Sequence, residues 1–299
     1  MSSQDALEDL QTVRDLLRYA VTCFNRADLF FGHGQPDAID EASFLIGRGL
    51  QLPLERLDLF LDARLTYTEL QHLLELIDTR VNKLVPAAYL LKEAWLQGYR
   101  FTVDERVIIP RSFIGELLRD GLHPWISEPE SMTNVLDLCT GSGCLAIMAA
   151  ECFEHAQVDA VDISSDALAV ARGNIVDYRL GARVHAIESD LFKTLKGRRY
   201  DLILCNPPYV TEAAMEQLPQ EYRHEPALAL AAGADGMRLI RQIVLQARQH
   251  LKPDGLLIVE VGDGRAELER QFPHLPFTWL TTSAGDDMVF MLKADELPE

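Results

Sequence analysis

The fold of this chain is decided by one stretch, Asn134-Val-Leu-Asp-Leu-Cys-Thr-Gly-Ser-Gly-Cys-Leu-Ala. Its first five residues are mostly apolar and predict a buried strand, while a helical pattern begins at Cys144. Between them, Gly141 and Gly143 allow a tight turn that brings the backbone close to a ligand. The unpaired N–H groups at the start of the helix would face that ligand. The stretch therefore predicts a strand, a ligand-binding loop and a helix in direct succession.

Strand and helix patterns continue to alternate after this stretch. They predict strands at residues 134–138, 157–162, 183–188, 201–205, 255–261, 277–280 and 288–292, and helices at 144–153, 165–178 and 237–250. Such alternation is typical of a doubly wound, Rossmann-like α/β protein, here with a seven-stranded sheet. A short polar turn at residues 283–287 joins the last two strands, so we expect five parallel strands finished by an antiparallel pair.

The first 85 residues predict a small helical domain. Apolar residues recur at helical spacing over residues 6–20, and a second helical pattern covers residues 37–48. Thr66 and Glu69 form a T-x-x-E capping box, so a further helix is expected to begin at Thr66.

Residues 86–110 predict a β-hairpin connector that leads into a larger domain at residues 111–299. The connector holds β-prone stretches broken by Gly98 and by an acidic pair, and these stretches cover residues 89–91, 95–103 and 106–109. The alternating α/β pattern begins only after Pro110, which sets the boundary of the larger domain.

The net charge of the chain limits the classes of partner that it is expected to bind. The 299 residues carry a net charge of −18 and a sequence pI near 4.8. Such acidity repels phosphate backbones, so we expect no direct DNA binding, and it would attract a basic protein. The same acidity also fits a protein that is simply kept soluble.

The amino-terminal sequence and the cysteines indicate a cytoplasmic protein. The chain starts with the polar, acidic run Met1-Ser-Ser-Gln-Asp, unlike a secretory signal, and no apolar run approaches the roughly 20 residues that span a bilayer. Five cysteines without a C-x-x-C pair fit a reducing compartment. The eight histidines are scattered without metal-ligand spacing, so we expect no metal site.

An acidic residue follows the glycines at the spacing of a ribose-binding carboxylate. The strand at 158–162 ends in Asp162, about twenty residues after the glycine loop, where a carboxylate accepts hydrogen bonds from both ribose hydroxyls. Residues 141–146 also fit the fingerprint Gly-x-Gly-x-x-Ala, so a nicotinamide cofactor is one alternative and a plain glycine turn is another. Asp137 favours S-adenosylmethionine, because a carboxylate suits an ammonium and a sulfonium and sits badly beside a pyrophosphate.

Asp190 and Phe192 follow the third predicted strand and complete the cofactor-binding set. We expect Asp190 to accept a hydrogen bond from the adenine amine, and Phe192 to pack on the adenine ring. The alternatives are that Asp190 caps a turn and that Phe192 belongs to the core. The predicted set as a whole is Asp137, Cys139, Thr140, Gly141, Ser142, Gly143, Asp162, Asp190, Phe192 and Asn206.

The fourth predicted strand runs directly into Asn206-Pro207-Pro208-Tyr209, the predicted catalytic motif. Prolines cannot continue a central strand, so the motif predicts a rigid loop at the edge where open α/β sheets bind ligands. An amide nitrogen attacks a methyl sulfonium only when it is held in line. The Asn206 side-chain oxygen and the Pro207 carbonyl would fix its two N–H groups, and Tyr209 would wall the acceptor plane. A dehydrogenase has no use for this motif, which disfavours the nicotinamide alternative.

These motifs resemble those of class I methyltransferases that modify exocyclic or amide nitrogens. DNA adenine-amine methyltransferases share the Asn-Pro-Pro-Tyr motif, so other stretches must identify the acceptor. Residues 86–111 are similar to the connector of protein N5-glutamine methyltransferases, and residues 225–236 to the segment after their catalytic loop. The similarity covers nearly the whole chain and implies methyl transfer from S-adenosylmethionine to the side-chain amide of a glutamine.

Within this family, Ser112-Phe-Ile-Gly-Glu stands where release-factor enzymes usually carry an acidic stretch. Together with Phe31-Gly-His-Gly and residues 37–42, it resembles the branch that acts on large-subunit ribosomal protein L3. The resemblance implies a basic, unassembled ribosomal protein as substrate, recognised by residues 1–85. Methylation of a release factor, or a non-catalytic role in ribosome assembly, stays as the alternative. Cys139 departs from the family pattern, since many methyltransferases have glycine there.

Overall fold

The computed structural model describes residues 3–299, with side chains described from Ala6 onward. The chain folds into two compact units. One comprises the residues up to Ala94 together with Pro219–His224, and we call it the helical unit. The other comprises Trp95–Leu218 and Glu225–Glu299, and we call it the sheet unit.

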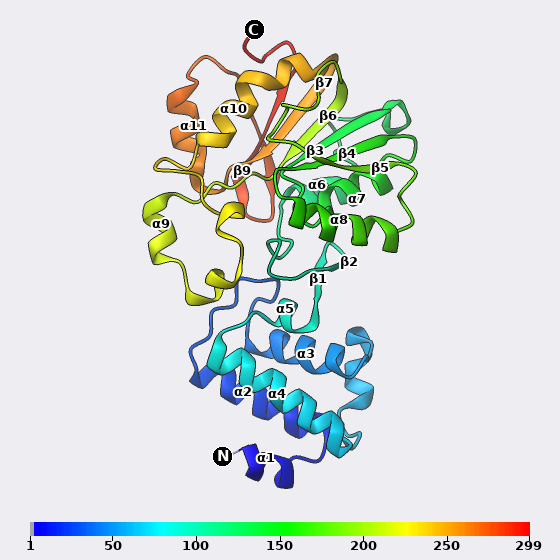
Figure 1. Ribbon diagram of the computed structural model, residues 1–299, viewed down its shortest axis with the longest axis vertical. Helices are drawn as coiled ribbons and strands as arrows, with labels where there is room; N and C mark the ends of the chain where they lie inside the picture. The colour runs from blue at the N-terminus through cyan, green and yellow to red at the C-terminus, as the bar shows by residue number, and fades with distance from the viewer. Residues whose placement is uncertain (1–2) are drawn as a thin grey trace. The chain divides into compact units, whose positions relative to one another are not determined.

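The helical unit is built from short helices around an apolar core (Figure 1). Its elements are α1 (Ser3–Asp9), α2 (Val13–Arg26), α3 (Ala38–Gly49), η1 (Leu54–Phe60), α4 (Tyr67–Lys83), α5 (Ala87–Leu91) and η3 (Gln220–His224). The core includes the fully buried side chains of Leu16, Phe24, Leu45 and Leu73. This packing stabilises helices that would be marginal on their own.

Side-chain caps set where these helices begin. The predicted capping box of Thr66 and Glu69 is confirmed at the start of α4. Asp37 caps α3 with its carboxylate. A second capping box, formed by Thr12 and Asp15, starts α2, so the apolar pattern predicted in this region is shared between α1 and α2. Each such cap contributes about 1 kcal/mol to helix stability.

Residues 219–224 belong to the helical unit, although they follow the Asn-Pro-Pro-Tyr motif in sequence. The Glu221 carboxylate is buried and accepts a hydrogen bond from the backbone N–H of Phe30 at 2.9 Å. It also lies 3.5 Å from the Arg80 guanidinium, which forms a second, almost fully buried ion pair with Glu41. This cluster fixes residues 219–224 to the helices, because a buried charge is strongly destabilising without its partner.

The connector differs from its prediction at its start. Residues 89–91, predicted to be β-prone, lie in helix α5, which begins directly after Pro86. The predicted hairpin is present as β1 (Glu93–Leu96) and β2 (Tyr99–Thr102). Both residues of the turn between them, at 97–98, have positive φ. The glycine therefore predicts the turn correctly, whereas apolar content alone does not separate a short helix from a strand.

The prediction of a β stretch at residues 106–109 is wrong. The Asp104 carboxylate accepts hydrogen bonds from the Arg106 backbone N–H and side chain, and the backbone turns between Asp104 and Val107. The N–H of Ile109 donates to the Glu225 carboxylate. Local and side-chain hydrogen bonds thus replace a strand ladder in this segment.

The sheet unit contains seven strands in the order β5-β4-β3-β6-β7-β9-β8. These strands are β3 (Asn134–Leu138), β4 (Gln157–Asp162), β5 (Val184–Glu188), β6 (Tyr200–Cys205), β7 (Leu251–Glu260), β8 (Thr278–Thr282) and β9 (Gly285–Lys293). The first five in this order are parallel, whereas β9 is antiparallel to both β7 and β8. The predicted α/β fold, with five parallel strands and an antiparallel pair, is confirmed.

Helices cover both faces of this sheet. They are α6 (Ile114–Arg119), α7 (Cys144–Cys152), α8 (Ser165–Asp177), α10 (Arg238–Gln246) and α11 (Arg265–Gln271), whereas α9 (Glu212–Gln217) has no buried residue. Figure 1 shows α7 and α8 on one side of the sheet and α10 and α11 on the other. The chain moves in opposite directions across the sheet after β3 and after β6, so the carboxyl ends of these two strands border the crevice where such sheets bind ligands.

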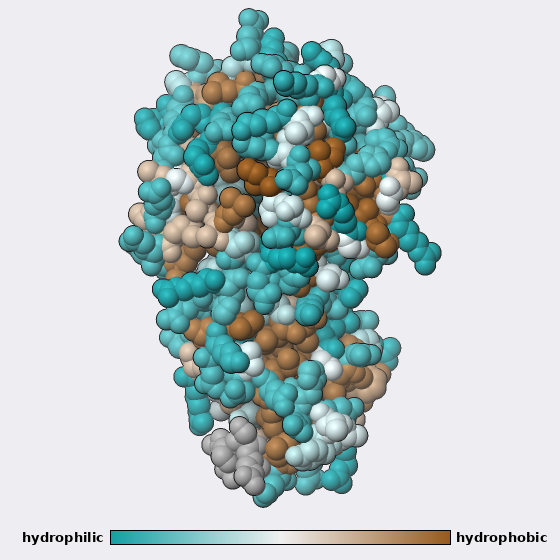
Figure 2. Space-filling view, in the orientation of Figure 1, coloured by the Kyte–Doolittle hydropathy of each residue, from teal (hydrophilic) through white to brown (hydrophobic). Residues whose placement is uncertain are grey.

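The surface seen in Figure 2 is mostly hydrophilic, with apolar side chains gathered in separate patches. Within residues 3–299, no helix has both the length and the apolar character needed to cross a membrane.

Candidate active site

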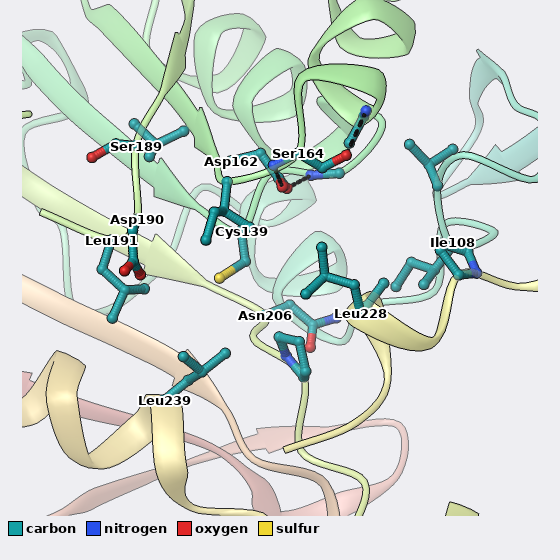
Figure 3. Close-up of a pocket in the computed structure, with 18 of the residues that line it drawn as sticks. Ile108, Cys139, Asp162, Ser164, Ser189, Asp190, Leu191, Asn206, Leu228 and Leu239 are labelled. Atoms are coloured by element: carbon teal, nitrogen blue, oxygen red, sulfur yellow. Dashed lines mark hydrogen bonds between the residues drawn. The ribbon is translucent and has the colours of Figure 1, made fainter. Parts of the chain in front are cut away.

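A cavity of about 260 Å³ lies at the carboxyl edge of the parallel strands (Figure 3). Loops after four neighbouring strands contribute to its wall, and the segment at 226–229 and helix α10 also contribute. Of the predicted site residues, those that line it are Cys139, Gly141, Asp162, Asp190, Asn206 and Pro208. The structure thus brings together side chains from β3, β4, β5 and β6, as the predicted switch point of the sheet requires.

The glycine loop turns through positive φ angles at three positions. Gly141 has a φ of 53° and Gly143 a φ of 81°, and a Cβ atom at Gly143 would lie 3.2 Å from the Cβ of Ala171 in α8. Cys139 also adopts a left-handed φ of 57°, at the position where it departs from the family pattern. Its side chain lines the cavity, so the chain accepts the strain of a non-glycine residue at the ligand-facing turn.

Asp137 lies behind the loop and not in the wall of the cavity. Its Oδ2 accepts hydrogen bonds from the Thr140 hydroxyl and from the N–H of Ala146 at 3.0 Å, so it ties the loop to the start of α7. Within the described residues, Oδ1 is buried without a hydrogen-bond partner. Burial raises the pKa of Asp137 to about 7. Thr140, Ser142 and Gly143 likewise belong to the folded loop and not to the cavity wall.

Asp162 presents its carboxylate to the cavity from the end of β4. One oxygen accepts the N–H of Gly141 and the other the N–H of Ser164, each at 2.9 Å. These bonds fix the carboxylate, and each oxygen keeps a lone pair for a ligand hydroxyl. Burial raises the pKa of Asp162, although both hydrogen bonds lower it.

Asp190 and Phe192 have different surroundings. Asp190 lines the cavity, and its carboxylate lies 2.5 Å from Lys193 Nζ. Phe192 is buried in the core, with its ring stacked on that of His250 at a centroid distance of 4.6 Å. Leu191, between them, lines the cavity in the place that the sequence interpretation gave to Phe192. When two adjacent residues are both apolar, the local sequence does not predict which of them faces a ligand.

Asn206 is the first residue of the predicted catalytic motif, directly after β6, and it lines the cavity. Its side-chain Nδ2 lies 3.5 Å from the backbone carbonyl of Arg111. Because a carbonyl only accepts, this contact orients the amide nitrogen away and leaves Oδ1 as an acceptor. Pro208 also lines the cavity, whereas Pro207 and Tyr209 do not belong to its wall.

The Tyr209 ring is held by its own neighbours. A Cβ atom at Gly262 would lie 2.7 Å from Cε2 of Tyr209, so only glycine admits the ring there. The hydroxyl of Tyr209 donates to Oε1 of Glu260 at 3.4 Å. Burial raises the pKa of Glu260 to about 7.

An ion pair between two residues outside the predicted site set borders the cavity. Arg111 donates to both oxygens of Glu225, at 2.5 and 2.6 Å, and the Glu225 side chain is fully buried. Glu225 directly precedes the wall segment 226–229, while the Arg111 carbonyl contacts Asn206. The pair therefore joins two parts of the site, which the sequence does not reveal because the partners lie 114 positions apart.

Acidic groups dominate this edge of the sheet. Asp137, Asp162 and Glu260 all have raised pKa values, and burial is the first cause in each case. Within residues 3–299, no cluster of histidine, cysteine, aspartate or glutamate is arranged to hold a metal ion. The donor set of the cavity, with carboxylates and backbone groups around an apolar floor, suits a small ligand that carries hydroxyl and ammonium groups.

Comparison with known proteins gives the class of this site. A family model described as the methyltransferase small domain matches residues 122–233. The fold resembles that of the hMettl16 catalytic domain in complex with MAT2A 3′UTR hairpin 6, with a TM-score of 0.50 and 14% identity, over 75% of this chain and 80% of that chain. The sheet order, the glycine loop and the cavity are those of a class I methyltransferase, whose methyl donor is S-adenosylmethionine.

Close relatives define the family. A chain from Burkholderia pseudomallei is 54% identical over 295 residues, covering 96% of each chain. Chains from Bordetella pertussis (53% over 290 residues, 97% of each chain) and Neisseria meningitidis (54% over 292 residues, 98% of this chain and 96% of that one) are similar to the same degree. All three are named ribosomal protein uL3 glutamine methyltransferase. This chain belongs to the ribosomal protein uL3 glutamine methyltransferase family.

Proposed function

We propose that this enzyme methylates the side-chain amide nitrogen of a glutamine in large-subunit ribosomal protein L3. The observation that carries the proposal is the position of Asn206 in the cavity wall, with its Nδ2 directed to the Arg111 carbonyl. Its Oδ1 is then an acceptor for an N–H group of the substrate. Acceptors without a neighbouring donor select an amide NH₂ over a hydroxyl or a thiol.

The acceptor amide must be oriented before it reacts. We assign Asn206 Oδ1 and the backbone carbonyl of Pro207 as the two acceptors for its N–H groups. Pro208 shapes the adjoining wall, and we assign the Tyr209 ring, which packs on Gly262 outside that wall, to one side of the acceptor plane. S-Adenosylmethionine supplies an electrophilic methyl group on its sulfonium when bound. Transfer of the methyl group would leave neutral S-adenosylhomocysteine and an amide nitrogen that carries the positive charge. This cation is acidic enough to lose a proton to water, so the chain has to supply positioning and no strong base.

The remaining site residues hold the donor. We assign Asp162 to the ribose hydroxyls, Asp190 to the adenine amine, and the loop from Cys139 to Gly143 to the amino-acid portion. Asp137 supports that loop from behind, through Thr140 and the start of α7. Phe192 stays in the core, stacked on His250, and its neighbour Leu191 faces the cavity.

The substrate protein follows from family and charge. The relatives named above carry ribosomal protein uL3 in their names. A net charge of −18 favours association with a basic protein and disfavours nucleic acid. We therefore propose that the enzyme meets the free ribosomal protein in the cytoplasm before assembly, and that the helical domain recognises it.

The test is transfer of a labelled methyl group. The purified enzyme is incubated with methyl-labelled S-adenosylmethionine and, separately, with unmodified ribosomal protein L3, a peptide release factor and duplex DNA. We expect label in the ribosomal protein alone, mapped by mass spectrometry to one glutamine. Asn206→Ala should reduce the rate by about 1,000-fold or more, because it removes the hydrogen-bond acceptor that holds the N–H group of the reacting amide nitrogen.

Other results would change the assignment. Label in the release factor or in DNA would keep the chemistry and replace the substrate. If the enzyme binds S-adenosylmethionine but labels none of the three acceptors, the proposed substrate and both alternatives are contradicted. Absence of both donor binding and label would favour a binding role in ribosome assembly.

A further inference from the structure

Glu260 is a buried carboxylate next to the catalytic motif. It is the last residue of β7, and its predecessor Val259 pairs with Cys205 of the parallel strand β6. Glu260 therefore lies beside Asn206 at the carboxyl edge of the sheet. Only 1% of its surface is exposed, and it does not line the cavity. A carboxylate in such a place needs hydrogen bonds to offset its loss of water.

The hydrogen bonds of Glu260 reach two separate segments. Its Oε2 accepts the Ser112 hydroxyl at 2.7 Å and the backbone N–H of Phe113 at 2.9 Å. Its Oε1 accepts the Tyr209 hydroxyl at 3.4 Å. One side chain thus joins the segment at 111–113 to the last residue of the catalytic motif.

The segment at 111–113 also holds the first residue of that motif. The carbonyl of Arg111 contacts Nδ2 of Asn206 at 3.5 Å, and Ser112 follows Arg111 directly. Both ends of the loop, at Asn206 and Tyr209, are therefore fixed to the same segment. Glu260 stands where these connections meet.

We propose that Glu260 is a positioning residue, which sets the orientation of the acceptor loop through Tyr209 and through the segment that carries Arg111. The proposal rests on the proposed function, in which Asn206 and Pro207 bind the acceptor amide. Glu260 touches neither substrate nor donor. Its removal slows methyl transfer by misplacing the loop, and it leaves the donor site, at the ends of β3, β4 and β5, intact.

The chemistry of glutamine makes Glu260→Gln a conservative control. A glutamine at this position keeps an oxygen for Ser112 and Phe113, and its NH₂ group can donate to the Tyr209 oxygen, which then accepts. The network survives without a charge. Glu260→Ala removes the hydrogen bonds to Tyr209 and to residues 112–113, and it leaves the Phe113 N–H without its acceptor.

The experiment compares three variants in the labelled methyl-transfer assay with ribosomal protein L3. We expect Glu260→Ala to lower kcat by about 100-fold, with the Kd for S-adenosylmethionine within about threefold of wild type. Glu260→Gln should keep kcat within about fivefold of wild type. Leu257→Ala, a deletion in the buried core on the same strand, is the control for lost stability and should leave kcat nearly unchanged when assayed well below its Tm.

A second measurement is independent of activity. Hydrogen exchange at the Phe113 amide, which donates to Glu260, should become at least about tenfold faster in Glu260→Ala and stay unchanged in Glu260→Gln and Leu257→Ala. Failure of the wild type to label ribosomal protein L3 would contradict the proposed function, while the exchange rates would still test the network. Equal losses of kcat in the alanine variants at 257 and 260, or unchanged exchange in Glu260→Ala, would overturn the positioning role. Loss of donor affinity in proportion to kcat would overturn it as well, because it would place Glu260 in the donor site.

Discussion

The two edges of the central sheet both carry buried or partly buried acidic groups, but these groups have different hydrogen-bond partners. At the amino edge, Asp159 pairs with Arg198 at 2.6 Å and accepts the Tyr200 hydroxyl at 2.7 Å. Asp201 pairs with Lys252 at 2.8 Å. These carboxylates form ion pairs with cationic side chains, so their role is to connect strands and not to bind a ligand.

At the carboxyl edge, the two carboxylates that end β4 and β7, Asp162 and Glu260, are satisfied by backbone N–H groups and hydroxyls. Asp162 accepts two backbone N–H groups, and Glu260 accepts one backbone N–H and two hydroxyls. The pKa of Asp201 is held below its ordinary value, because its hydrogen bonds outweigh burial, whereas burial raises the pKa of Asp162 and Glu260. Of these carboxylates, Asp162 lines the cavity and keeps lone pairs for a ligand, whereas Glu260 connects the strand edge to the acceptor loop.

The largest expected effect concerns stability at high pH. Glu260 has a pKa of about 7 in the folded protein against 4.5 when unperturbed. A raised folded pKa means that its contribution is complete below the unfolded value and is lost as the pH rises through 7. Between about pH 5 and about pH 9, we expect the wild type to lose roughly 3 kcal/mol relative to Glu260→Gln. Urea unfolding of both proteins at the two pH values measures this, and a difference that does not change with pH would show that Glu260 is already charged in the fold.

A smaller effect separates the two ends of one strand. Asp162→Asn should weaken S-adenosylmethionine binding by about 30-fold, or about 2 kcal/mol, because it removes a charged acceptor. Asp159→Asn, on the same strand at the amino edge, should leave donor affinity unchanged and lower only the Tm. Titration calorimetry of the two variants measures the contrast. Equal losses of affinity would mean that the strand responds as a whole and that the edges are not distinct.

The smallest effect lies at the amino edge. Lys252→Met removes the cation from Asp201, which is partly exposed, and should cost about 1 kcal/mol near pH 7. The lowered pKa of Asp201 means that this stabilisation is present above the unfolded value of 3.8 and is lost as the pH falls through the folded value. Denaturant unfolding at neutral and acid pH should show the difference disappearing in acid. A reduced rate of methyl transfer in this variant would contradict the separation of the two edges.

Much of the sheet could be predicted from the sequence because its signals are local. The strands β3 and β4 end where an apolar run meets a glycine turn or an acid, and their observed bounds equal the predicted ones. The start of α4 at Thr66 follows from a capping box that spans only four residues. Asp162 and Asn206 were placed by the same logic, since each follows the last residues of a predicted strand.

The rest depends on partners that are distant in sequence. The sequence around Arg111 does not predict its ion pair with Glu225, and the sequence around Tyr209 does not predict its hydrogen bond to Glu260. Residues 89–91 form a helix and not a strand, because Pro86 starts a turn that apolar content cannot distinguish from an extended segment. The assignment of Phe192 to the adenine ring fails to anticipate the stacking on His250, 58 residues further along the chain.

The return of residues 219–224 to the helices bears on how this chain can be divided or recombined. A gene fragment that begins at residue 95 would encode Glu221 without Arg80 and without the Phe30 N–H, so residues 219–224 would lose the helices that hold them. The helical unit is therefore not a detachable amino-terminal module. A chimera of two family members should fold only when residues 219–224 and the amino-terminal segment come from the same parent. Recombination that separates the two stretches is therefore expected to be selected against.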